Sequence, residues 1–148
     1  MDASWRTALS ATLHCLTGCA IGEVLGMVLG TAFGWSAGAT VGLSIALAFF
    51  FGYLLTSLPL LRSGMALGAV VPIALASDTV SIAVMEVVDN TILVAIPGVM
   101  DAGLGDIAFW AALAGSLVVA GAAALQVNRW LIGRGKGHAV VHQHHQHA

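Results

Sequence analysis

Residues 14–34 read HCLTGCAIGEVLGMVLGTAFG, an apolar stretch with glycine at every fourth position: Gly18, Gly22, Gly26, Gly30 and Gly34. Residues four apart share one face of an α-helix, and small residues at this spacing let membrane helices approach closely. The pattern predicts a membrane-spanning helix whose glycine row packs against protein. Its partner is either another span of this chain or a second copy.

The composition supports a membrane setting for the whole chain. Of 148 residues, 59% are apolar and 8% are charged, whereas soluble domains average about 45–50% and about 25%. The mean hydropathy is +0.96. The net charge of −2 provides no basic surface for nucleic acid. We therefore expect an integral protein of the lipid bilayer.

Four apolar stretches meet the length of about 20 residues that a spanning helix needs, at residues 9–33, 37–58, 65–88 and 107–132. Their short connections predict an all-α, antiparallel four-helix bundle over residues 1–137. Residues 64–100 are too many for one crossing. We therefore expect a helix over 65–88, followed by an interfacial or re-entrant piece up to Ile96.

The basic residues predict an orientation. With four spans, Arg6, Arg62, Arg129, Arg134 and Lys136 all fall on one side of the membrane. The positive-inside rule places that side, and both termini, in the cytoplasm.

A second row follows the glycines by one residue and holds Cys15, Cys19, Glu23 and Met27, with His14 beside it. Imidazole, thiol and thioether groups are ligands for Cu(I) and Zn(II). The alternative is ordinary packing, because Cys and Met are common in cores.

The third span carries Asp78, Met85, Glu86 and Asp89. A mid-span carboxylate costs about 2.5–3.5 kcal/mol on insertion scales and by default marks a site or pathway. No Lys or Arg lies deep in any span, so Glu23 and these carboxylates need a proton or a bound cation. Counting from the span starts places Glu23 and Asp78 at one depth. We expect Glu86 and Asp89 to line the outer mouth.

The C-terminal segment, residues 138–148, is rich in histidine, with His138, His142, His144, His145 and His147. Such tracts bind Zn, Cu or Ni. This tail could buffer metal near the cytoplasmic mouth, or it could be only a solvated tail or a cloning remnant.

No nucleotide-binding or metalloprotease motif occurs, and the two cysteines do not form a C-x-x-C pair. We therefore expect a binding or transport protein rather than an enzyme. Haem ligation is disfavoured because His14 is the one histidine within a span.

Several stretches resemble a bacterial integral-membrane family of unknown function. They are HCLTGCAIGEVLGM (14–27), SDTVSIAVMEVVDN (77–90), MDAGLGD (100–106) and VNRWLIGRGKGHAVVH (127–142). The first two carry the patterns HCxxGCxxGE and DTxSIxxMExxDN. The resemblance implies a small multi-span protein of the bacterial inner membrane and brings no established activity.

The leading hypothesis is a protein that binds or transports a metal cation, with Cu(I) or Zn(II) favoured. His14, Cys15 and Cys19 would form a soft site, Met27 and Met85 would add thioethers, and the carboxylates would form the cation or proton pathway. One alternative is an accessory subunit that packs on a larger membrane complex through the glycine row, and another is a haem or quinone redox protein. We expect a homo-oligomer, because four spans enclose little space.

Overall fold

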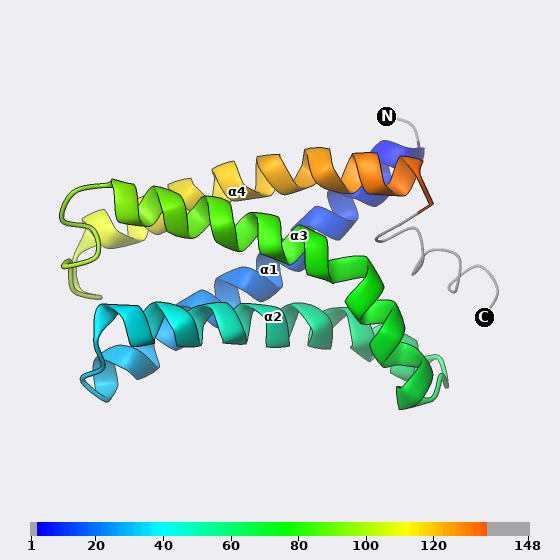
Figure 1. Cartoon of the computed structure of the whole chain (residues 1–148), viewed down its shortest axis with the longest axis horizontal. Helices are drawn as coiled ribbons and strands as arrows, with labels where there is room; N and C mark the ends of the chain where they lie inside the picture. The colour runs from blue at the N-terminus through cyan, green and yellow to red at the C-terminus, as the bar shows by residue number, and fades with distance from the viewer. Residues whose placement is uncertain (1–2, 136–148) are drawn as a thin grey trace.

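The computed structural model describes residues 3–135, which form four α-helices without a strand among them (Figure 1). The helices are α1 (Ala3–Ala32), α2 (Ala37–Arg62), α3 (Leu67–Ala95) and α4 (Ile107–Gly133). All four are long and apolar enough to cross a membrane. Successive helices run in opposite directions. The predicted all-α, four-span bundle is confirmed.

The helix ends have local causes. Ser36 caps α2 by accepting a hydrogen bond from the Ala39 backbone N–H at 3.3 Å, and Asp106 caps α4 by accepting one from Ala108 N–H at 2.9 Å. Gly34 follows α1 with φ +67°, a left-handed conformation that glycine adopts without strain. Gly34 therefore makes the turn into α2.

The expected break in the third span is wrong, because α3 is one helix that continues to Ala95. Its polar residues are accommodated inside the bundle. Asp89 accepts a hydrogen bond from Ser116 of α4, and the Asn90 side chain donates to the Glu86 carbonyl. Helix α3 is about 43 Å long at 1.5 Å per residue and bends along its length (Figure 1). Its first part contains Pro72, which removes a helical hydrogen bond.

The glycine row of α1 packs against α2 of the same chain. A Cβ added to Gly18 would lie 2.8 Å from the Gly52 backbone, so the two helices touch through main chain there. The row on α2 also has a small residue at every fourth position. The facing pairs are Gly18 with Gly52, Gly22 with Ala48, Gly26 with Ser44 and Gly30 with Thr40.

The other contacts place α1 and α3 in the middle of the bundle, with α2 and α4 on opposite flanks. Helix α1 contacts all three other helices. The α1–α2 contact is made by glycines, whereas the α1–α3–α4 contact contains polar and sulfur-bearing side chains. The polar and sulfur-bearing side chains of α1 are therefore concentrated on the side that faces α3 and α4.

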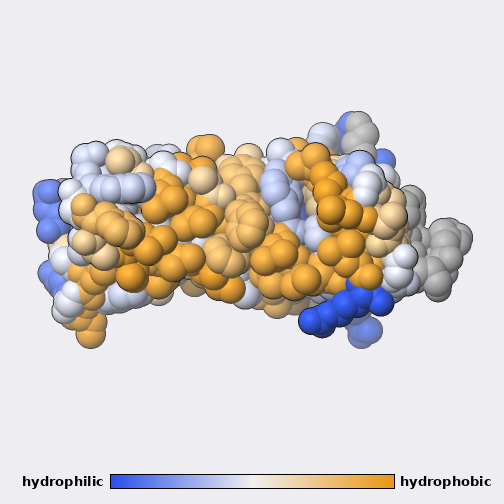
Figure 2. Space-filling model, turned by 90° about the horizontal axis from the view of Figure 1, so that it is seen from below, coloured by the Kyte–Doolittle hydropathy of each residue, from blue (hydrophilic) through white to orange (hydrophobic). Residues whose placement is uncertain are grey.

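The face of the bundle seen in Figure 2 is largely apolar along its length, and its most hydrophilic residues lie toward the ends. Val87, Val94 and Val118 are each more than 60% exposed, yet Glu23 and Asp78 are fully buried. This distribution suits a lipid-facing exterior.

Arginines mark one end of the bundle and aspartates the other. Arg6 lies at the start of α1 and Arg62 at the end of α2. The Arg129 guanidinium stacks 4.0 Å from the centre of the Trp5 ring, which joins the end of α4 to the start of α1. Asp101 and Asp106 lie in the 96–106 connection at the opposite end. Lys136, the fifth basic residue used to predict the orientation, falls outside the described residues. So do the predicted metal ligands of the tail, His138, His142, His144, His145 and His147.

Candidate intramembrane cation site

Four carboxyl groups lie in the interior of the bundle. Glu23, Asp78 and Asp89 have no exposed surface, and Glu86 is 5% exposed. The expectation that Glu86 and Asp89 line an outer mouth is therefore wrong, because both are buried in the bundle. They are buried because α3 continues for six residues beyond Asp89 and α4 packs over them.

Three of these carboxyls, Glu23, Glu86 and Asp89, form what we call the acidic cluster. Glu23 of α1 lies close enough to Asp89 and Glu86 of α3 for their charges to influence one another. Ser116 Oγ of α4 donates to Asp89 Oδ1 at 2.5 Å, and Asn90 Nδ2 donates to Glu86 Oε2 at 3.3 Å. Within the described residues, neither carboxyl oxygen of Glu23 has a hydrogen-bond partner. The Glu23 carboxyl therefore has unused hydrogen-bonding capacity beside two other buried carboxyls.

A sulfur pair lies one helical turn from the acidic cluster. Cys19 Sγ of α1 is 3.8 Å from Met85 Sδ of α3. Cys19 also interacts with Glu86, so the pair and the cluster adjoin. Neither cysteine forms a disulfide, and Cys15, Cys19 and Met85 pack in one buried cluster.

Asp78 lies nearer the arginine-bearing end than the acidic cluster. The Cys15 thiol donates to Asp78 Oδ1 at 3.9 Å, and Ser77 Oγ donates to the same oxygen at 3.0 Å. The prediction that Glu23 and Asp78 meet is therefore wrong, since Glu23 meets Asp89 instead. Helix α1 begins at Ala3, so counting its depth from residue 9 misplaced it by about 9 Å.

A polar crosslink that the sequence analysis missed completes the interior. Asn128 Nδ2 of α4 donates to Thr12 Oγ1 of α1 at 3.0 Å and to Ser81 Oγ of α3 at 3.1 Å. These residues, like Ser116, are almost fully buried. A repeat of small or polar residues at every fourth position of α4 marks this face: Ser116, Ala120, Ala124 and Asn128.

Two of the predicted metal ligands lie apart from the sulfur pair. His14 heads the glycine row, which faces α2, whereas the cysteines face α3. Met27 belongs to a separate core cluster with Leu93. Among the described residues, no three His, Cys, Asp or Glu side chains converge in a geometry that could hold a metal ion. The predicted soft site is thus reduced to sulfur, with carboxyl groups beside it.

The fold and interior define a class: a multi-pass helical membrane protein with an acidic, sulfur-containing core. The chain matches the model of the family described as "Domain of unknown function (DUF4396)" over residues 4–137, and it belongs to that family. No curated protein and no solved structure matches the chain.

Proposed function

We propose that the protein binds and transports a soft metal cation, with Cu(I) as the cargo that fits best. The observation that carries this proposal is the acidic cluster beside the Cys19–Met85 pair, with no Lys or Arg in the spans at that depth. Buried carboxylates need a compensating positive charge, and sulfur ligands select soft cations.

The sulfur pair favours Cu(I) over Zn(II). Cu(I) is bound by thiolate and thioether ligands, and the two sulfurs 3.8 Å apart could both reach one ion after small side-chain shifts. Zn(II) sites use four tetrahedral ligands of the Cys, His, Asp and Glu types. The described residues offer no cluster of this kind.

The chemistry-bearing row of α1 suits stepwise movement. Cys15, Cys19, Glu23 and Met27 follow one another by four residues, or about 6 Å along the helix axis. Thiol, carboxyl and thioether groups thus recur through most of the membrane depth. We propose that a cation moves along this row, with the carboxyls of α3 neutralising it.

The alternatives have less support. The glycine row that would attach an accessory subunit is occupied by α2, so such a partner would need another surface. A haem or quinone would need ligands besides His14, the one histidine among residues 3–135. The homo-oligomer remains a prediction. We further propose a bacterial inner membrane location with the arginine-bearing end in the cytoplasm, where the histidine tail could collect metal.

Copper binding tests the site directly. Purified protein is incubated with Cu(I) under reducing conditions, and bound copper is measured by elemental analysis. We expect Cys19→Ser and Met85→Leu each to weaken Cu(I) binding at the Cys19–Met85 pair at least tenfold and so to lower the copper content. Met65→Leu is the matched control, because Met65 packs in a cluster with Leu60 and Val70. Unchanged copper content in a Cys19→Ser/Met85→Leu double variant would overturn the proposed site.

Transport is tested separately in liposomes. We expect Glu23→Gln to insert normally, because the substitution replaces the carboxyl by a neutral amide of nearly the same shape. The variant should lose Cu(I) uptake. Undiminished flux in that variant, with insertion verified by co-flotation of the protein with the liposomes after carbonate washing, would refute the pathway.

A further inference from the structure

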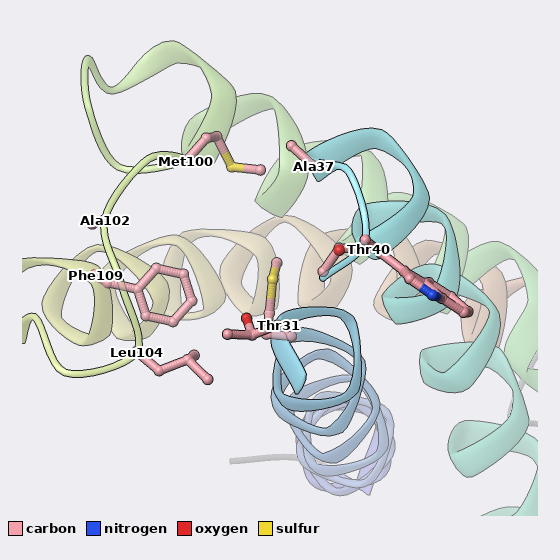
Figure 3. Close-up of a pocket in the computed structure, with 9 residues that line it drawn as sticks. Thr31, Ala37, Thr40, Met100, Ala102, Leu104 and Phe109 are labelled. Atoms are coloured by element: carbon pink, nitrogen blue, oxygen red, sulfur yellow. The ribbon is translucent and has the colours of Figure 1, made fainter. Parts of the chain in front are cut away.

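A cavity of about 160 Å³ opens at the aspartate end of the bundle. It lies between the 33–36 turn and the 96–106 connection, and the ends of α1, α2 and α4 complete its walls (Figure 3). Phe109 and Leu104 lie opposite Thr31, and the Met100 side chain points toward Ala37 (Figure 3). A water molecule occupies about 30 Å³ in the liquid, so the cavity has room for a partly hydrated ion.

Two methionines, Met27 and Met100, line this cavity from different segments of the chain. Thioethers are neutral, soft ligands that prefer Cu(I)-type ions. No carboxylate, thiol or imidazole is among the lining residues, whereas the hydroxyls of Thr31 and Thr40 and the rings of Trp35 and Phe109 are. Aromatic faces attract cations. This lining favours a soft monovalent cation over a hard divalent one.

The position of Met27 connects the cavity to the interior. Met27 is 7% exposed and packs in the core against Leu93 and Phe109. It lies one helical turn from Glu23, about 6 Å along α1. A cation held by Met27 would therefore be next to the acidic cluster.

We propose that this cavity is a second cation site, in which Met27 and Met100 bind a soft monovalent cation at the entrance to the acidic cluster. Its role as an entrance rests on the proposed function, whereas the binding itself does not. Met27 is the fixed ligand because it is held in the core. Met100 lies in the connection between α3 and α4, where its half-buried side chain can close over the ion.

Trp35 provides a built-in reporter of binding, because it lines the same cavity. The experiment titrates Ag(I), a stable mimic of Cu(I), into the full-length protein in nanodiscs and follows tryptophan fluorescence. We expect saturable quenching that disappears in Trp35→Phe. The Met27→Leu/Met100→Leu double variant should bind Ag(I) at this site at least tenfold more weakly. Met65→Leu is the control, and thermal unfolding verifies that the double variant is folded.

The outcomes separate the two proposals. Trp35 quenching that is unaffected by the methionine replacements, or that Zn(II) reproduces equally well, would overturn the cavity site. A Cys15→Ser/Cys19→Ser variant should keep the quenching, since the cysteines lie deeper in the bundle. Methionine-dependent quenching without any Cu(I) flux in liposomes would leave the cavity site standing and would refute the transport function.

Discussion

Replacing Gly22 by alanine tests how the close α1–α2 contact supports the fold. A Cβ at this position would lie 2.5 Å from both Ala48 Cα and the Leu47 carbonyl carbon. Ordinary carbon–carbon contacts are about 3.5–4.0 Å, so the two backbones would have to separate by about 1 Å or more. Neither contact atom belongs to a side chain that could rotate away.

The expected magnitude follows from two opposing effects. Forcing extra atoms into a packed interior costs about 1–3 kcal/mol, while alanine gains about 0.5–1 kcal/mol over glycine in a helix. Gly42→Ala is the matched control, because a Cβ added to Gly42 on α2 meets nothing within 4 Å. The helix-propensity gain is common to both variants. The free energies of unfolding of the two variants should therefore differ by about 1–3 kcal/mol.

The assay is reversible unfolding in mixed micelles of mild detergent and dodecyl sulfate, followed by circular dichroism. Gly30→Ala adds a graded test, since the three atoms nearest to its Cβ would all belong to the side chain of Thr40, and we expect a smaller loss than for Gly22→Ala. Equal stability of Gly22→Ala and Gly42→Ala would refute the reasoning. So would a rank order in which Gly30→Ala is the most destabilising.

Three further predictions address the polar interior and the orientation. Ser116→Ala removes the hydrogen bond that Ser116 Oγ donates to Asp89 and should lower the free energy of unfolding by about 0.6 kcal/mol, the average measured for such bonds in membranes, and by no more than about 1.7 kcal/mol; an Asp89→Ala background, which removes the acceptor, should abolish most of this loss. Asn128→Leu breaks the crosslink among α1, α3 and α4, and micelle unfolding should show a loss larger than that of Ser116→Ala, whereas an equal or smaller loss would argue against the crosslink. The native cysteines are buried, so labelling reports on introduced cysteines. Ser63→Cys should react with an impermeant maleimide only in broken cells, and Gly103→Cys should react in intact cells as well. The reverse pattern would show the opposite orientation.

The sequence was sufficient for the number and course of the helices. Long apolar runs broken by short polar turns leave few alternatives, and the residues at those turns have local signals, such as Ser36 and Asp106 as caps. The end of α3 was not predictable in the same way. Asp89 and Asn90 are polar enough to end a span, and they continue one only because Ser116 and Glu86 satisfy them.

Which residues of α3 face the cysteines and Glu23 of α1 was the least predictable part of the site. Helical periodicity placed Cys15, Cys19 and Glu23 on one face, but their partners depend on how far α1 slides along α3. That offset is set by the start of α1 at Ala3 and by tertiary contacts. The small-residue row on α2, residues 40, 44, 48, 52 and 56, was a signal in the sequence for the partner of the glycines.

Helix α1 combines two functions on neighbouring faces. Three of the four glycines of the close contact precede a residue of the chemical row, as Gly18–Cys19, Gly22–Glu23 and Gly26–Met27. Successive residues are about 100° apart around a helix, so one row can touch α2 while the other faces α3. Because the α2 contact is made through main chain, it fixes both the rotation and the height of α1. The spacing of thiol, carboxyl and thioether groups against α3 therefore depends on glycines that contact none of them.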